Sequence, residues 1–151
     1  MDFLPISNYD IFHSLLEPYY REGADAETSQ EELDSFIEYL FGLVTDGVIS
    51  GCVAYDEKPV GICLWWIDSE ELPFSNKPGW GTILEMGLVP AFRGKGKGRE
   101  MAEYALSQME VSDFYVCAYG PAEAFWKKCG YEDVGEIASN GLKLLVQEKK
   151  V

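Results

Sequence analysis

The chain has 151 residues, which is the usual size of one compact domain, so we expect a single domain over residues 1–151. Hydrophobic residues make up 47% of it, which excludes disordered and collagen-like chains. Twelve basic against 26 acidic side chains give a net charge of −14, which disfavours nucleic acid and anionic membrane surfaces as partners.

Cysteine and histidine usage argues against a metal site. The chain has no CxxC pair, and His13 is its one histidine, so we expect no metal and no Ser-His-Asp or Cys-His nucleophile. The longest apolar stretch, 60–67, is too short to span a bilayer, and the start lacks a basic signal-peptide region. We therefore expect a cytoplasmic protein with buried thiols.

Two helices follow a short extended start at residues 2–6. The first is expected to be capped by Ser7 and to bend or end at Pro18. The second is expected to begin at Ser29, because Ser29 and Glu32 form a capping-box pattern. Its apolar positions recur at helical spacing: Leu33, Phe36, Ile37, Leu40, Phe41 and Val44.

Residues 52–55 and 60–67 predict an antiparallel hairpin. The second of these strands is apolar on both faces, which is typical of a central strand covered by helices. Trp65 and Trp66 cannot share a face, so one of them either lines a pocket or joins the core.

The second half of the chain alternates strands and helices. Strand 82–89 leads through a glycine loop into a helix, and strand 114–119 leads into a short helix at 121–129. Strands 131–136 and 142–147 complete the chain. The predicted order is β-α-α-β-β-β-α-β-α-β-β, an α/β (mixed α+β) fold with parallel and antiparallel pairs in one sheet.

The glycine loop concentrates basic residues in an acidic chain. Glycines let successive N–H groups point outward, and the helix that follows adds the positive end of its dipole, so the loop predicts a phosphate site. It is neither GxxxxGK[ST] nor GxGxxG, which argues against a P-loop and a Rossmann site. A basic surface turn is the alternative. The basic residues are Arg93, Lys95, Lys97 and Arg99.

Two blocks carry a resemblance to a known family. The pattern Arg93-x-x-Gly96-x-Gly98, after a strand ending at Val89, resembles the acyl-CoA pyrophosphate loop of the GNAT superfamily of N-acetyltransferases. Residues 119–131 are similar to the family's Asn-x-x-Ala-x-x-Phe-Tyr-x-x-x-Gly-Phe ending. Tyr119 stands where the family often has Asn, and Trp126 stands where it often has the general-acid Tyr.

The resemblance implies a GNAT-like fold and transfer of an acetyl group from acetyl-CoA to a primary amine. By the same resemblance, the main chain at Gly87, Leu88 and Val89 would bind the pantetheine arm, and an N–H near Leu88 would polarise the thioester. Phe125 and Trp126 would border the thiol end, or belong to the core. The implied pyrophosphate-binding residues are Arg93, Gly94, Lys95, Gly96, Lys97, Gly98 and Arg99.

Two side chains are catalytic candidates for direct transfer in a ternary complex. An alkyl amine is protonated at neutral pH and must lose a proton before attack, and Glu85 on the loop's strand is the candidate base. Tyr119 is the candidate acid for the leaving thiolate, since the indole of Trp126 cannot serve. A thiol also leaves without an acid near neutral pH.

The acceptor and the oligomeric state stay open. Acidic residues crowd the first connection and the second helix, where they either steer a cationic small-molecule or protein amine or form a solvated face. They are Glu22, Asp25, Glu27, Glu31, Glu32, Asp34 and Glu38. The alternative function is a module that binds acyl-CoA without transferring the acyl group, and a homodimer is compatible with either function.

Overall fold

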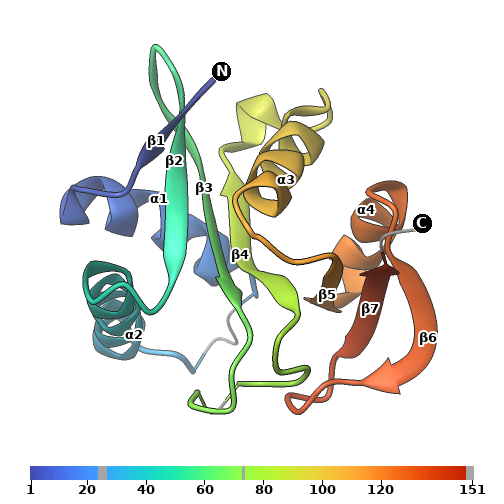
Figure 1. Ribbon diagram of the computed structural model, residues 1–151. Helices are drawn as coiled ribbons and strands as arrows, with labels where there is room; N and C mark the ends of the chain where they lie inside the picture. The colour runs from blue at the N-terminus through green and yellow to red at the C-terminus, as the bar shows by residue number, and fades with distance from the viewer. Residues whose placement is uncertain (24–26, 73, 149–151) are drawn as a thin grey trace. The chain divides into compact units, whose positions relative to one another are not determined.

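The computed structural model describes residues 1–23, 27–72 and 74–148, and in this part seven strands form one mixed sheet in the order β1-β2-β3-β4-β5-β7-β6 (Figure 1). The expected element order and mixed sheet are confirmed. The strands are β1 (Asp2–Pro5), β2 (Ser50–Asp56), β3 (Lys58–Ile67), β4 (Gly81–Leu88), β5 (Asp113–Ala118), β6 (Glu132–Ile137) and β7 (Lys143–Glu148). The α-helices are α1 (Tyr9–Gly23), α2 (Gln30–Thr45), α3 (Lys97–Ser107) and α4 (Glu123–Lys128), with 3-10 turns η1 (Pro90–Phe92) and η2 (Gly120–Ala122).

The chain divides into two compact units, each with its own internal contacts. The first unit holds Met1–Leu64 and Glu85–Met101, and the second holds Trp65–Leu84 and Ala102–Val151. Strands β3 and β4 each run through both. No helix in the described part of the chain is long and apolar enough to cross a membrane.

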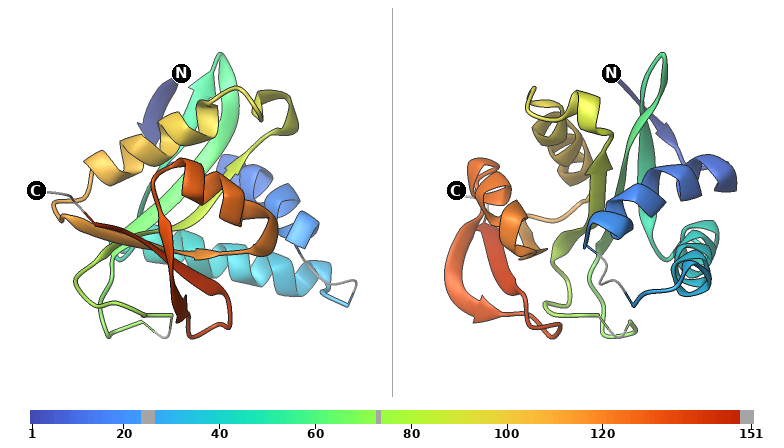
Figure 2. Two further views of the ribbon diagram at one scale, coloured as in Figure 1. Left: turned by 90° about the vertical axis from the view of Figure 1, so that its right-hand side faces the viewer. Right: turned by 180° about the vertical axis from the view of Figure 1, so that it is seen from behind.

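In the first unit, α1 and α2 lie side by side along β1 and β2 (Figure 2). The expected cap of α1 is wrong, and so is an end at Pro18, although a bend there stays a prediction. Asn8, one residue after Ser7, caps the helix by accepting the N–H of Ile11 at 3.0 Å. The helix also continues through Pro18 to Gly23, because its buried face, and not the local propensity of one exposed proline, decides where it ends.

The expected start of α2 is confirmed, since the Ser29 side chain accepts the N–H of Glu32 at 3.0 Å. The buried face of α2 is narrower than the apolar face that the sequence pattern predicts. Phe36 is 44% exposed and meets Tyr20 edge to face, with ring centroids 5.4 Å apart. The helix buries three apolar side chains: Leu33, Ile37 and Leu40.

In the second unit, β4 and β5 run parallel over two residue pairs, Gly81–Phe114 and Thr82–Tyr115. Strand β7 pairs antiparallel with β5 along its whole length, and β6 forms the outer strand (Figure 2). Both tryptophans of β3 are core residues. Trp65 is 6% exposed and Trp66 5%, so neither lines an open pocket.

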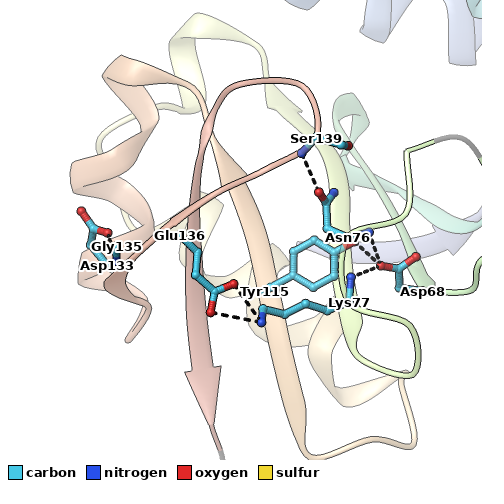
Figure 3. Close-up of polar contacts among 8 residues, drawn as sticks. All are labelled: Asp68, Asn76, Lys77, Tyr115, Asp133, Gly135, Glu136 and Ser139. Atoms are coloured by element: carbon cyan, nitrogen blue, oxygen red, sulfur yellow. Dashed lines mark hydrogen bonds and ion pairs between the residues drawn. The ribbon is translucent and has the colours of Figure 1, made fainter.

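A buried carboxylate organises the connection between β3 and β4 in the second unit (Figure 3). Asp68 Oδ2 accepts the Tyr115 hydroxyl at 2.7 Å and the backbone N–H groups of Asn76 at 2.8 Å and Lys77 at 2.7 Å. The Asn76 side-chain oxygen accepts the N–H of Ser139 at 2.8 Å. The connection is thus tied to β5 and to the β6–β7 hairpin by polar contacts that start at one aspartate.

Replacing Tyr115 by Phe tests this cluster. We expect Tyr115→Phe to lower the free energy of unfolding by about 1–3 kcal/mol in urea titrations at pH 7, because a buried acceptor loses its donor. Burial raises the pKa of Asp68, but hydrogen bonds from Tyr115 and the backbone hold it below its ordinary value. The stabilisation is therefore present at neutral pH and lost on acidification through that lowered pKa.

The matched control is Tyr39→Phe, on an exposed tyrosine of α2, which we expect to change stability by less than about 0.5 kcal/mol. An equal loss in both variants would show that the Asp68–Tyr115 bond contributes nothing specific.

Candidate active site

The carboxyl end of β4 carries the predicted base, and its two faces meet different helices of the first unit. A Cβ added to Gly87 would lie 3.3 Å from Cδ2 of Tyr19, so this face meets α1. A Cβ added to Gly61 on β3 would lie 2.7 Å from Leu88 Cδ2 and 3.5 Å from Met101 Cε, so the other face meets α3. Because strand side chains alternate, Glu85 shares the face of Gly87 and points toward α1.

Burial under α1 tunes the Glu85 carboxyl group. Burial raises its pKa to about 7, against the opposing effect of hydrogen bonds from Tyr19 and Tyr20. The Tyr20 hydroxyl is buried without a well-formed hydrogen bond among the described residues, and burial, with the charge of Glu85 adding to it, raises the pKa of Tyr20. A carboxyl group with a pKa near 7 exchanges protons at neutral pH, as a general base requires.

The main chain of β4 presents an N–H group three residues after Glu85. Val89 donates its N–H to the carbonyl oxygen of Val60 on β3 at 2.8 Å. Backbone groups alternate in direction along a strand, so the N–H of Leu88 points away from β3. Strand β4 pairs with β5 at Gly81 and Thr82, seven and six residues before Leu88.

The glycine loop runs directly into a helix. Gly94 and Gly96 have φ of +75° and +78°, a left-handed conformation that glycine adopts without strain. Helix α3 begins at Lys97, so Lys97 and Gly98, predicted to be loop, lie in its first turn. The first helical bond runs from the N–H of Glu100 to the carbonyl of Gly96 at 3.1 Å, which leaves earlier N–H groups directed out of the helix end. This geometry suits phosphate oxygens.

The basic side chains of the loop have different surroundings. Arg93 donates to the carbonyl of Leu88 and to Glu22, so its guanidinium is used within the unit. Lys95 Nζ lies 6.0 Å from the ring centroid of Phe92, and its backbone is exposed. Two further cations follow in the helix: Lys97, with Nζ 3.8 Å from Glu100, and the exposed Arg99.

The remaining predicted site residues belong to the second unit. Tyr119 follows β5 and is 54% exposed, so its phenol is accessible. Trp126 is 7% exposed and packs on Tyr131, with ring centroids 5.5 Å apart, which makes it a core residue of this unit. Phe125 is half-buried and meets the Trp126 ring at 4.9 Å.

Some acidic side chains of the first connection and α2 pair with a basic side chain, and others are exposed to solvent. Asp34 accepts His13 at 2.7 Å, a contact that lowers the pKa of Asp34, and Glu22 is paired with Arg93. Glu31, Glu32 and Glu38 are exposed on α2, and Asp25 lies outside the described residues. Among the residues described, no cluster of three or more His, Cys, Asp or Glu could hold a metal ion.

Sequence reasoning missed the two tyrosines that form the environment of Glu85. Tyr19 and Tyr20 are adjacent in α1, directly after Pro18, where the helix was expected to bend or end. The only available signal was the helical spacing of Phe12, Leu16 and Tyr19, which places Tyr19 on the buried face.

Comparisons with known proteins agree on one family. The family model described as "Acetyltransferase (GNAT) family" matches residues 9–131. The structure is similar to GCN5 of Tetrahymena, with 12% identity, TM-score 0.66, and 99% of this chain and 97% of that one covered. It is also similar to a GNAT family N-acetyltransferase (YhbS) of Escherichia coli solved with CoA. The identity is 15%, the TM-score is 0.69, and the match covers 99% of this chain and 81% of that one.

A third similar structure is an aminoglycoside 6'-N-acetyltransferase of Acinetobacter haemolyticus. The identity is 15%, the TM-score is 0.69, and the match covers 91% of this chain and 95% of that one. At these identities the solved structures show a common fold. No curated protein sequence matches the chain significantly.

The raised pKa of Glu85 makes a prediction about stability. A carboxyl whose pKa is higher in the folded state opposes folding once it ionises, so stability should fall as pH rises from about 4.5 to about 7. Glu85→Gln removes this loss. We expect Glu85→Gln to gain about 1–2 kcal/mol over wild type between pH 5 and pH 8 in urea titrations. The same difference at both pH values would contradict a buried, titrating Glu85.

Proposed function

The chain belongs to the GNAT acetyltransferase family, and from that premise we propose that it moves the acetyl group of acetyl-CoA to a primary amine by direct attack in a ternary complex. One observation carries the proposal. Glu85, with a pKa of about 7, lies on the same strand as the outward N–H of Leu88, three residues away. A base for the amine and a donor for the thioester oxygen thus stand on one rigid element.

The first unit fits the acyl donor. The glycine loop leads into the first turn of α3, whose N–H groups ahead of the first helical bond suit the oxygens of a pyrophosphate. Lys95 and Lys97 add positive charge to the same loop. The outward backbone of β4 at Leu88 matches the amides of an extended pantetheine arm, which would join the strand as a further strand does.

The proposed chemistry needs two proton transfers from the acceptor nitrogen and one bond exchange. Ionised Glu85 accepts the first proton from the ammonium group of the acceptor, directly or through water. The amine nitrogen then attacks the thioester carbon, and the Leu88 N–H stabilises the negative charge on the oxygen. When the C–S bond breaks, the nitrogen keeps the acetyl group and gives its second proton to water, and the electron pair of the bond leaves with sulfur.

No cysteine of the first unit favours an acetyl-enzyme route. Burial raises the pKa of Cys52 to about 12 and that of Cys63 well above its ordinary value, so both remain protonated and unreactive. For the leaving thiolate, Tyr119 is the proposed proton donor, on the strength of its accessible phenol. Water is the alternative donor, since a thiolate leaves without an acid near neutral pH.

We propose a cationic amine, small or on a protein, as the acceptor. Support comes from the net charge of −14 and from the exposed carboxylates Glu31 and Glu32 at the start of α2. The exposed ring of Phe36 contacts the ring of Tyr20, and the pKa of Tyr20 is raised by its burial and by Glu85. An aromatic surface with acidic neighbours suits a second ammonium group or an alkyl chain. A cytoplasmic location is proposed with it.

The second candidate is a module that binds acyl-CoA without transferring the acyl group. It is favoured by Trp126, a buried indole where the family often has a titrating phenol. This candidate predicts binding of acetyl-CoA with no acetylation of any amine. Turnover with any acceptor separates the two.

Calorimetric titration with acetyl-CoA tests the donor site. We expect binding by wild type and about tenfold weaker binding by Lys95→Ala/Lys97→Ala, because two charge-assisted contacts to phosphate are lost. Lys58→Ala, on an exposed lysine at the start of β3, is the matched control and should bind as wild type. If the wild-type protein does not bind acetyl-CoA, both candidate functions are wrong.

The pH dependence of acetyl transfer tests the base. With a polyamine acceptor, we expect kcat/KM to rise with pH and level off above about 7, because Glu85 must be ionised to accept a proton. Glu85→Gln should lower kcat by about 10²-fold or more and remove that inflection.

Glu57→Gln, on an exposed residue of the β2–β3 turn, is the matched control and should keep both rate and inflection. An unchanged inflection in Glu85→Gln would assign the base elsewhere. Faster transfer to neutral amines than to polyamines would contradict the proposal that the acceptor is a cationic amine.

A further inference from the structure

The side chain of Arg93 bridges two elements of the first unit. Its Nε donates to the carbonyl oxygen of Leu88 at 2.9 Å, and its Nη2 donates to Glu22 Oε1 at 2.9 Å. Arg93 is 44% exposed and Glu22 56%, so the ion pair by itself adds little to stability. A planar guanidinium that holds two acceptors at once nevertheless fixes their relative geometry.

One end of the bridge holds the peptide that follows Leu88. The N–H of this peptide belongs to Val89 and is bonded to Val60, while its carbonyl oxygen is bonded to Arg93. The peptide is therefore held from both sides. The direction of the neighbouring Leu88 N–H, the proposed donor to the thioester oxygen, follows from that orientation because both groups point to the same edge of β4.

The other end of the bridge holds the last turn of α1. Glu22 lies three residues after Tyr19, whose ring lies so close to Gly87 that an added Cβ there would approach it to 3.3 Å. Residues three apart on a helix lie on neighbouring parts of its surface, so a restraint at Glu22 also restrains Tyr19. Tyr19 in turn acts on Glu85 through a side-chain hydrogen bond that opposes the rise in its pKa.

We propose that the Glu22–Arg93–Leu88 bridge is a positioning device for acetyl transfer, in which Arg93 holds the end of α1 over Glu85 and orients the Leu88 peptide at the same time. The inference rests on the proposed function for its catalytic meaning. It gives Arg93 a second role besides the one expected for a loop cation. It makes Glu22 a positioning residue that need touch neither donor nor acceptor.

The structure gives a reason why this position needs arginine. The two acceptors of Arg93 belong to different elements, and the guanidinium reaches them with separate N–H groups of one rigid plane. A lysine ammonium at the same position is a single point charge and would satisfy Glu22 or Leu88 but hardly both. If Arg93 acts only as an anion ligand, lysine should replace it with little loss.

The test measures the titration of Glu85 itself, by carbon NMR of glutamate-labelled protein, with Glu85→Gln to identify its signal. Tyr19 and Tyr20 of α1 face the carboxyl group, and Cys63 of β3 acts on Tyr19. In Glu22→Gln we expect the last turn of α1 to loosen and water to reach the Glu85 carboxyl group. We therefore expect the midpoint to fall from about 7 by about half a pH unit or more.

Arg93→Lys should lower the midpoint in the same direction, and Glu57→Gln, an exposed charge-matched control, should leave it unchanged. In acetyl transfer, Glu22→Gln should lower kcat about tenfold, with the KM for acetyl-CoA within about twofold of wild type. The inflection of the pH–rate profile should move with the NMR midpoint.

Two results would overturn the positioning role: a Glu22→Gln midpoint equal to that of wild type, or a raised KM for acetyl-CoA with unchanged kcat. The NMR midpoint decides the matter without turnover. If the wild-type protein is inactive, the proposed function is wrong. The titration still decides whether the bridge positions α1 over Glu85.

Discussion

The base proposed for this protein depends on the close contact between α1 and the main chain of β4. The ring of Tyr19 lies against Gly87, where an added Cβ would approach it to 3.3 Å, so a larger residue would require Tyr19 to shift. This contact places Tyr19 and Tyr20 around Glu85. Burial there raises the pKa of the Glu85 carboxyl group to about 7, against the opposing effect of hydrogen bonds from the two tyrosines.

The geometry of β4 by itself decides where the proposed base and the proposed N–H donor point. Because side chains alternate between faces, Glu85 and Gly87 turn toward α1 while Leu88 turns toward α3. Because backbone groups alternate within the sheet, the N–H of Leu88 turns away from β3. One strand therefore supplies a side-chain base and a main-chain donor, and the glycine loop that follows it supplies an anion site at a helix start.

Local patterns in the sequence predicted the elements well where local chemistry decides them. The Ser29 cap, the order of strands and helices and the strand–loop–helix unit of Arg93 were all readable, since caps, periodicity and glycines act over a few residues. Contacts between distant segments were not readable. The passage of α1 through Pro18 and the contact of Arg93 with Glu22, 71 residues away, result from tertiary packing that no short pattern encodes.

Amide NMR during a titration with CoA tests whether the end of β4 and the start of α3 bind the acyl donor. We expect the backbone N–H signals of Leu88 and of the loop from Gly94 to Gly98 to shift together and to saturate at one ligand concentration. Binding that leaves the Leu88 and loop signals unmoved, with shifts elsewhere in the chain, would contradict it.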